Sequence, residues 1–231
     1  MQFNYPVTIA AIDHRQSLKK LLHPENPGST GFEELVLAKK KLAAALADEV
    51  EYILIDPVYG KWIVDQPMKA KLLFCLEESG IEGETKLIPN WGVRQAKELG
   101  AVGVKLLIKD SQEDIDLAKK IRQECREEGI IFLLETLSRE IDRFKQIEAD
   151  VYKLKYIPED LSAPWVLLSA GMEFEAYKSA LAAAGKKGCS GMAVGRAIWQ
   201  DLVPDFNEAI IKKRVRELIQ IVNQFGKGVK L

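Results

Sequence analysis

The sequence lacks the features that mark several classes of protein. Lys and Arg total 33 against 34 for Asp and Glu, a net charge of −1, so no excess of either sign points to nucleic acid or an anionic membrane surface. No window approaches the roughly 18 uncharged apolar residues of a membrane span. Asp13, His14 and Arg15 interrupt the first apolar stretch too early for a secretion signal. We therefore expect no nucleic-acid partner and no membrane partner.

Cysteine and histidine are also scarce. The three cysteines, Cys75, Cys125 and Cys189, are odd in number and far apart, which fits neither a disulfide framework nor a CxxC metal site. His14 and His23 are the only histidines, and no HxxxH motif or His/Cys cluster occurs. The sequence thus predicts reduced packing thiols, a cytoplasmic location, and a chemistry that needs no metal and no other cofactor.

What the sequence does contain is a regular alternation of short apolar runs and amphipathic stretches. The runs are nearly continuous in apolar residues, which is typical of parallel strands buried on both faces. We predict eight strands, over Val7–Ile12, Tyr52–Ile55, Lys86–Pro89, Val102–Ile108, Ile130–Glu135, Val151–Ile157, Trp165–Ser169 and Gly191–Gly195. The stretches between them predict helices over Phe32–Val50, Gln66–Ser79, Val93–Leu99, Gln112–Glu128, Arg139–Glu148, Glu173–Ala184 and Phe206–Phe225.

Eight strand–helix units in 231 residues give about 29 residues each, the size of a minimal βαβ repeat. No linker or low-complexity tract divides the chain. We therefore predict an α/β protein with one domain, residues 1–231, folded as a compact (β/α)8 TIM barrel. The alternative is a doubly wound open sheet, which should show a Gly-rich turn after its first strand. Here the first strand runs into Ala-Ile-Asp-His-Arg-Gln, without a glycine.

Polar residues gather where the predicted strands end. In a barrel, chemistry takes place at the carboxyl ends of the strands and in the loops that follow them. Every predicted strand contributes at least one polar side chain there: Asp13 and Arg15, Asp56, Asn90, Lys105, Glu135, Lys153, Ser169 and Arg196.

Two lysines inside apolar strands, with an acid on the strand between them, suggest Schiff-base chemistry. A single lysine at a strand end usually reaches water, but Lys105, Glu135 and Lys153 can converge if all three point into a barrel. A lysine attacks a ketone only as the neutral amine, and at a pKa of about 10.4 only about 0.04% is neutral at pH 7. A second ammonium and low solvation lower such a pKa, and a carboxylate can carry the protons.

Spacing leaves two assignments open. Lys155 lies two residues beyond Lys153, so strand alternation places both side chains on the same face. Asp13 and Arg15 could bind the far end of a substrate, or they could pair with each other as a structural bridge.

The last two units predict an anion site. Loops after the seventh and eighth strands of such barrels commonly hold phosphate. Ser169 offers a hydroxyl, and Ala170 and Gly171 offer backbone N–H groups before a helix. Gly195 permits close approach of the backbone, and Arg196 can hold a phosphate with two parallel hydrogen bonds. We therefore expect a phosphorylated substrate.

Seven segments, taken in order along the chain, carry a resemblance to a known family. They are Ala11–Gln16, Leu54–Gly60, Trp91–Asp110, Phe132–Thr136, Asp150–Lys153, Leu168–Gly171 and Gly195–Trp199. With these segments the chain resembles the tagatose-1,6-bisphosphate aldolase family of class I aldolases, which also includes sulfofructose-1-phosphate aldolases. The resemblance implies reversible cleavage of a ketose 1-phosphate to dihydroxyacetone phosphate and an aldehyde.

Carried over by position, the resemblance implies a role for each matching residue. Lys153, not Lys155, forms the imine, Glu135 is the acid/base, and Lys105 and Asp13 complete the catalytic set. The phosphate-binding segments match Ser169, Ala170, Gly171, Gly195 and Arg196. The chain departs from the family where His14 replaces a usual Gln and where Lys155 replaces an expected acid. Asn90 stands before Trp91 where the family often has a charged residue. These departures surround the aldehyde half of the pocket.

Two other functions use the same predicted anion site. A phosphosugar isomerase on the same fold would need no imine, and a non-catalytic sugar-phosphate sensor would bind without turnover. The expected partner in each case is a phosphorylated sugar, and a homo-oligomer is compatible with the sequence.

Overall fold

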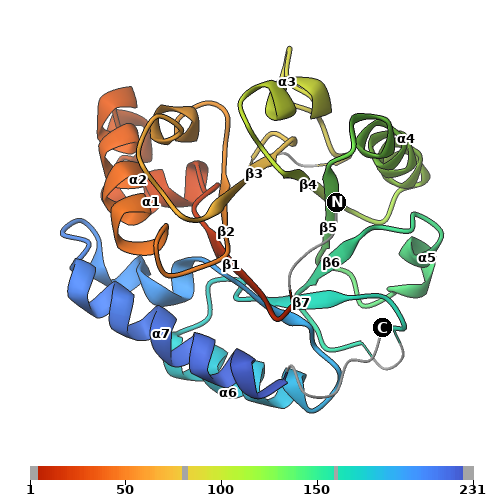
Figure 1. Ribbon diagram of the computed structural model, residues 1–231. Coiled ribbons are helices and arrows are strands. Elements are labelled where there is room, and N and C mark those ends of the chain that lie inside the picture. The colour runs from red at the N-terminus through yellow and green to blue at the C-terminus, as the bar shows by residue number, and fades with distance from the viewer. Residues whose placement is uncertain (1–4, 80–82, 159–160, 226–231) are drawn as a thin grey trace.

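The chain forms a closed barrel of parallel strands. A computed structural model describes residues 5–79, 83–158 and 161–225. Each strand pairs with the next in sequence, and β1 also pairs with β8, so the sheet has no open edge (Figure 1). The predicted (β/α)8 barrel is confirmed, and the open-sheet alternative is wrong. The strands are β1 Val7–Ala11, β2 Tyr52–Ile55, β3 Lys71–Cys75, β4 Gly103–Ile108, β5 Ile131–Thr136, β6 Val151–Leu154, β7 Trp165–Leu168 and β8 Gly191–Val194.

Helices surround the strands on the outside of the barrel (Figure 1). Helix α4, one of the longer ones, shows how local sequence sets the ends of a helix. Ser111 caps its start by accepting a hydrogen bond from the Asp114 backbone, and Gly129 ends it in a left-handed conformation with φ of 68°. The α-helices are α1 Gln16–Leu22, α2 Phe32–Leu46, α3 Val93–Glu98, α4 Gln112–Glu128, α5 Asp142–Lys145, α6 Phe174–Gly185 and α7 Glu208–Phe225.

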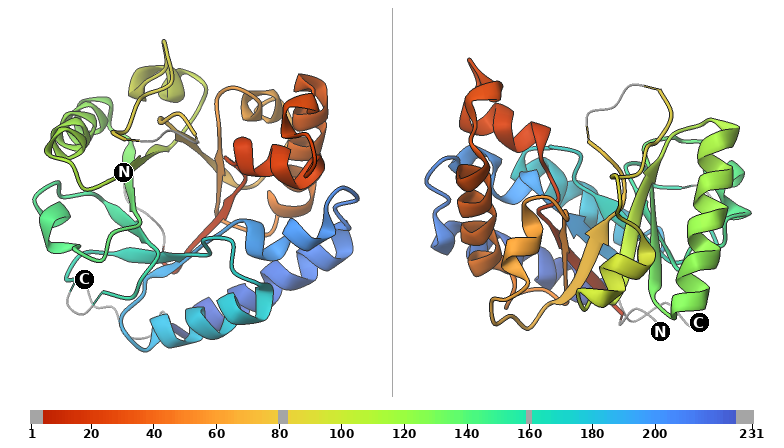
Figure 2. Two further views of the ribbon diagram at one scale, coloured as in Figure 1. Left: turned by 180° about the vertical axis from the view of Figure 1, so that it is seen from behind. Right: turned by 90° about the horizontal axis from the view of Figure 1, so that it is seen from above.

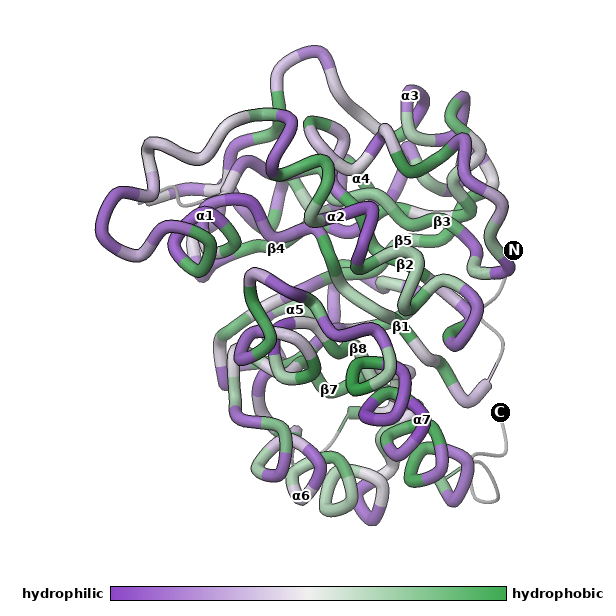
Figure 3. Tube along the Cα trace, turned by 90° about the vertical axis from the view of Figure 1, so that its left-hand side faces the viewer, coloured by the Kyte–Doolittle hydropathy of each residue, from purple (hydrophilic) through white to green (hydrophobic). Residues whose placement is uncertain are grey.

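The barrel interior is apolar along most of its length. One cluster of buried side chains fills it, and Ile131, Leu133 and Val151 belong to that cluster. Because strand side chains alternate, Glu135 lies on the same inner side as Leu133, and Lys153 lies on the same side as Val151. Glu135 and Lys153 are also register partners across β5 and β6. The apolar strands therefore lead to a polar layer at their carboxyl ends. Figure 3 shows the labelled strands mostly in the green of hydrophobic residues.

The third strand differs from the prediction. Lys71–Cys75 forms β3, in the region where helical spacing of apolar residues predicts the helix Gln66–Ser79. The predicted strand Lys86–Pro89 is wrong, since this segment is a loop that returns beside the end of β3 through one isolated bridge between Glu77 and Leu87. A short apolar run fits a buried strand and a buried helix equally well, so periodicity could not separate them.

The connections differ from the prediction in three further places. Helix α1 was not predicted, and it stands at the end of the barrel to which the strands point (Figure 2, right). The predicted helix Arg139–Glu148 shortens to α5, Asp142–Lys145. Strand β6 ends at Leu154, so Lys155 follows the strand and is not part of it. In the part of the chain that the structure describes, no helix is long and apolar enough to cross a membrane.

Candidate active site

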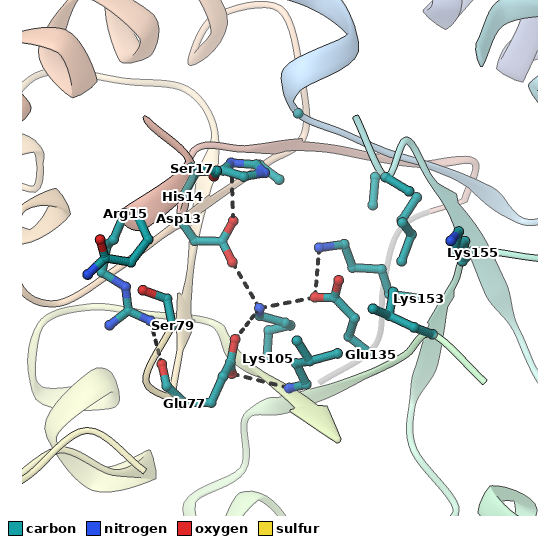
Figure 4. A pocket seen from close by; sticks show the side chains of 18 of the residues that line it. Asp13, His14, Arg15, Ser17, Glu77, Ser79, Lys105, Glu135, Lys153 and Lys155 are labelled. Atoms are coloured by element: carbon teal, nitrogen blue, oxygen red, sulfur yellow. Dashed lines mark hydrogen bonds and ion pairs between the residues drawn. The ribbon is translucent and has the colours of Figure 1, made fainter. Parts of the chain in front are cut away.

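Lys105 lies at the centre of a cluster of carboxylates at the carboxyl ends of the strands (Figure 4). Its Nζ is 2.9 Å from Oδ2 of Asp13 and 3.0 Å from Oε2 of Glu135, and it also contacts Oε1 of Glu77. The second oxygen of Glu77 accepts a hydrogen bond from the Leu107 backbone, at 3.2 Å. These contacts join the carboxyl ends of β1, β3, β4 and β5 through one ammonium group.

Lys153 extends this cluster to β6. Its Nζ donates to Oε2 of Glu135 at 2.9 Å, and its side chain is almost fully buried. Lys155 also lines the cavity, but it lies apart from the cluster in Figure 4 and its Nζ is 5.2 Å from the ring centre of Tyr156. The structure therefore separates the two lysines that sequence alternation left equivalent.

Lys105, Asp13 and Glu135 stay ionised because opposite charges lie close to each of them. Burial would lower the pKa of Lys105, but the charges of Asp13, Glu135 and Glu77 outweigh burial and hold that pKa well above its usual value. Burial would likewise raise the pKa of Asp13 and of Glu135, yet Lys105 and Lys153 hold both below their usual values. Glu135 is thus a carboxylate in direct contact with Nζ of Lys153.

One group of side chains resembles a metal site in its composition. Asp13, Cys75 and Glu77 bring three potential ligand atoms within 4.8 Å of one another. The ammonium of Lys105 contacts both carboxylates of this group. A metal ion would have to displace that ammonium, so these residues suit a lysine better than a cation from solution.

The cluster forms the floor of a cavity of about 600 Å³ at the carboxyl ends of the strands. One side of this cavity is formed by Ser169, Ala170, Gly195 and Arg196, from the ends of β7 and β8. The Gly195 backbone donates to Oγ of Ser169 at 3.3 Å, which ties the two strand ends together. Among the residues that the structure describes, Arg196 has no carboxylate partner, and its buried Nε has no hydrogen-bond partner.

The turn after β7 is shaped to receive the Arg196 guanidinium. Ala170 and Gly171 both have positive φ, at 47° and 76°. A side chain at Gly171 would start 3.1 Å from Cζ of Arg196, so the guanidinium lies directly over this glycine. Gln200 donates to the Gly171 carbonyl at 3.2 Å and holds the turn. Helix α6 begins only at Phe174, so Ala170 and Gly171 precede the helix by several residues.

Arg15 lies on another side of the same cavity (Figure 4). Its Nη2 donates to the Glu77 backbone carbonyl at 2.5 Å, whereas Asp13 pairs with Lys105. The alternative in which Asp13 and Arg15 bridge each other is therefore wrong. In the described part of the chain Arg15 has no carboxylate partner, and its Nε is buried without a hydrogen-bond partner.

Comparison with known proteins agrees with this geometry. No protein-family model matches the chain. The tagatose 1,6-diphosphate aldolase of Staphylococcus haemolyticus is 25% identical over 270 aligned residues, which cover 87% of this chain and 83% of the relative. The enzyme of the same name from Staphylococcus aureus strain JH9 is 26% identical over 273 residues, with the same coverage. The chain is thus similar, over most of its length, to enzymes named tagatose 1,6-diphosphate aldolase.

Solved structures support the barrel fold of the chain. An archaeal fructose-1,6-bisphosphate aldolase, solved with its catalytic Lys bound to the carbinolamine intermediate, superposes with a TM-score of 0.66. It is 17% identical and is covered over 94% of both chains. A Schiff-base-forming fructose-1,6-bisphosphate aldolase gives a TM-score of 0.65, also at 17% identity.

Two polar residues that were predicted at strand ends lie outside the cavity. Asp56 is fully buried and pairs with Lys39 of α2 at 2.8 Å, so it is a structural residue. Asn90 follows no strand, because the predicted strand before it is a loop, and it does not line the cavity.

Glu77 is the member of the cluster that the sequence analysis missed. It follows the apolar run that forms β3, as other polar residues follow their strands, but that run was assigned to a helix. An acid placed directly after Leu-Leu-Phe-Cys-Leu was the signal available in the sequence.

Proposed function

We propose that the protein is a class I aldolase, which reversibly cleaves a ketose 1-phosphate to dihydroxyacetone phosphate and an aldehyde through an imine on Lys153. The observation that carries this proposal is the contact of 2.9 Å between Nζ of Lys153 and the carboxylate of Glu135, inside the cavity that Arg196 also lines. An amine with an adjacent proton acceptor, in a water-poor interior, is what nucleophilic attack on a ketone requires.

Glu135 carries the protons of imine formation. Its carboxylate takes a proton from the Lys153 ammonium, and the free amine adds to C2 of the ketose to give a carbinolamine. Glu135 returns the proton to the C2 hydroxyl, which leaves as water and yields the iminium ion. The charge of Lys105 is offset by three carboxylates, which leaves proton transfer to Glu135 as the route by which Lys153 becomes neutral.

The iminium ion then accepts the electrons of the C3–C4 bond. A carboxylate, assigned here to Glu135, takes the C4 hydroxyl proton while that bond breaks, and the aldehyde leaves an enamine on Lys153. Protonation at C3 and hydrolysis of the imine release dihydroxyacetone phosphate. Lys105 holds Glu135 and Asp13 in place, and Asp13 faces the substrate hydroxyls.

The strand ends of β7 and β8 supply the 1-phosphate subsite. Ser169, Ala170, Gly195 and Arg196 line the same cavity, the Gly195 backbone contacts the Ser169 hydroxyl, and the Arg196 guanidinium lies against Gly171. Since Arg196 lacks a carboxylate partner among the described residues, a phosphate would supply the missing charge.

Arg15 supports an anionic group at the far end of the substrate. Its guanidinium lines the same cavity and pairs with no carboxylate in the described part of the chain. The favoured substrates are therefore ketose 1-phosphates that carry a second anion at C6, either a phosphate, as in tagatose 1,6-bisphosphate, or a sulfonate, as in sulfofructose 1-phosphate.

The test is release of dihydroxyacetone phosphate from a panel of 1-phosphorylated ketohexoses with an anionic or a neutral C6 group. Lys153→Met should abolish release, whereas the matched variant Lys155→Met should keep most of it. Arg15→Leu should lower kcat/KM for the substrates with an anionic C6 group and spare the neutral ones. Full activity of Lys153→Met with an intact fold would refute the proposal, and binding without turnover would favour a sensor.

A further inference from the structure

His14 is a partly buried histidine in the cavity to which the proposed function gives no role. The sequence analysis assigned it to the aldehyde half of the pocket, but its ring lies against Gly195, next to Arg196. Its side chain is 21% exposed and lines the cavity between Asp13 and the strand end that carries Gly195 and Arg196. The edge of its ring meets Trp199, with centroids 5.5 Å apart at 80°. Its backbone carbonyl accepts a hydrogen bond of 2.8 Å from Lys39. Ring and backbone are thus both held in place.

Gly195, the residue after β8, leaves space for the His14 ring. A side chain at Gly195 would begin 2.6 Å from Cε1 and 3.4 Å from Nε2 of His14. Contacts of 2.6 Å are not seen for real side chains, so the imidazole occupies the space that the glycine leaves open. The Nε2 edge of His14 therefore lies beside Gly195, whose own N–H contacts Ser169.

The other ring nitrogen faces Asp13. Nδ1 is 3.8 Å from Oδ1 of Asp13, and it is buried without a hydrogen-bond partner. A carboxylate on that side favours the proton on Nδ1, which leaves Nε2 as the bare nitrogen. Burial lowers the pKa of His14 to about 3, and the positive charges of Arg196, Lys153 and Lys39 act in the same direction against Asp13. In the free protein the ring is neutral.

We propose that His14 is a further ligand of the substrate's 1-phosphate, which it contacts through Nε2 beside Gly195 and Arg196. This inference rests on the phosphate subsite of the proposed function. A phosphate oxygen at Nε2 requires a proton between the two atoms, because Nδ1 keeps its own proton toward Asp13. The complex therefore holds one proton more than the free protein and the free dianion, and the ring becomes an imidazolium between two anions.

The first experiment compares borohydride trapping of dihydroxyacetone phosphate with trapping of dihydroxyacetone, which lacks the phosphate. The variants are His14→Phe, His14→Gln and the matched control His23→Gln, since His23 pairs with Glu34 outside the cavity. His14→Phe should raise the half-saturating concentration of the phosphorylated ketone about ten- to hundredfold. It should leave that of dihydroxyacetone unchanged, which also shows that the fold is intact. His14→Gln, whose amide can donate to a phosphate, should recover part of the loss.

The second experiment measures the affinity for inorganic phosphate between pH 7 and 9. In the unaltered protein and in His23→Gln, the affinity should fall by up to about tenfold per pH unit, as the uptake of one proton requires. In His14→Gln it should be nearly constant. Equal losses of both ketones in His14→Phe, or equal pH slopes in all variants, would overturn the inference. Absence of any adduct on Lys153 would instead refute the proposed function, while the phosphate titration would still test His14.

Discussion

Replacing Lys39 by Met should destabilise the protein more than any substitution of a neighbouring lysine on α2. Lys39 is fully buried, and its ammonium pairs with Asp56 at 2.8 Å. It also donates to the backbone carbonyls of Ile12 at 2.5 Å and His14 at 2.8 Å. Lys39 thus connects α2 and the end of β2 to the turn after β1, from which Asp13, His14 and Arg15 project.

The size of the effect follows from what the substitution leaves behind. Met at this position leaves the carboxylate of Asp56 buried without a counter-charge. Breaking a buried ion pair by removing one partner costs about 3–5 kcal/mol. For a chain of this length that corresponds to a fall in Tm of about 6–20 °C. Asp56 still accepts hydrogen bonds from the backbones of Val58 and Tyr59, at 2.9 and 2.8 Å.

The assay is urea unfolding of Lys39→Met, the double variant Lys39→Met/Asp56→Asn and the control Lys41→Met. Lys41 is exposed on the same helix, so its loss should change the free energy of unfolding by less than about 0.5 kcal/mol. The double variant should regain much of the stability, because Asn removes the charge and keeps an acceptor for both backbone N–H groups. Equal midpoints for Lys39→Met and Lys41→Met would refute the reasoning.

Three further predictions concern the cavity. Gly171→Ala should raise KM for phosphorylated ketoses several-fold and leave kcat unchanged, because its methyl group would press on Arg196 at 3.1 Å from Cζ. An unchanged KM would contradict the phosphate subsite at Arg196. The pKa of His14, about 3 when folded against 6.5 for an ordinary His, means that the unfolded chain takes up a proton first as the pH falls. The stability contributed by neutral His14 is therefore complete above pH 6.5 and is lost toward pH 3. Over this range, the free energy of unfolding of His14→Gln, measured by thermal unfolding, should change less steeply with pH than that of the unaltered protein, by up to about 1.4 kcal/mol per pH unit. Lys105→Met should abolish aldol cleavage and lower the free energy of unfolding at pH 7 by about 3–5 kcal/mol. Near pH 4 the decrease should be smaller, because carboxylates left without the ammonium take up protons. A decrease in stability that does not depend on pH would argue against charge as the cause.

The barrel and most of the polar layer at its strand ends could be predicted from the sequence because both follow from short-range patterns. Apolar runs of strand length set the repeat, and a polar residue at the end of a run marks the carboxyl end of a barrel strand. Lys105, Glu135 and Lys153 each interrupt such a run, so their convergence required only the closure of the sheet.

The remaining features depend on contacts that no local pattern contains. Strand β3 was mistaken for a helix, because a short apolar run between polar segments satisfies both periods, and Glu77 was lost with it. Lys39 lies in a run of three lysines that suggests a solvated helix face, yet tertiary packing turns it inward to Asp56. The position of the His14 ring depends on the space left by Gly195, a residue far away in the sequence.

Borohydride reduction in the presence of dihydroxyacetone phosphate shows whether Lys153 forms an imine. Intact mass followed by peptide mapping should find one reduced adduct per chain, on Lys153. An adduct on Lys155 or Lys105 would contradict the assignment of the nucleophile. No adduct, under conditions in which inorganic phosphate still binds, would contradict Schiff-base chemistry in this cavity.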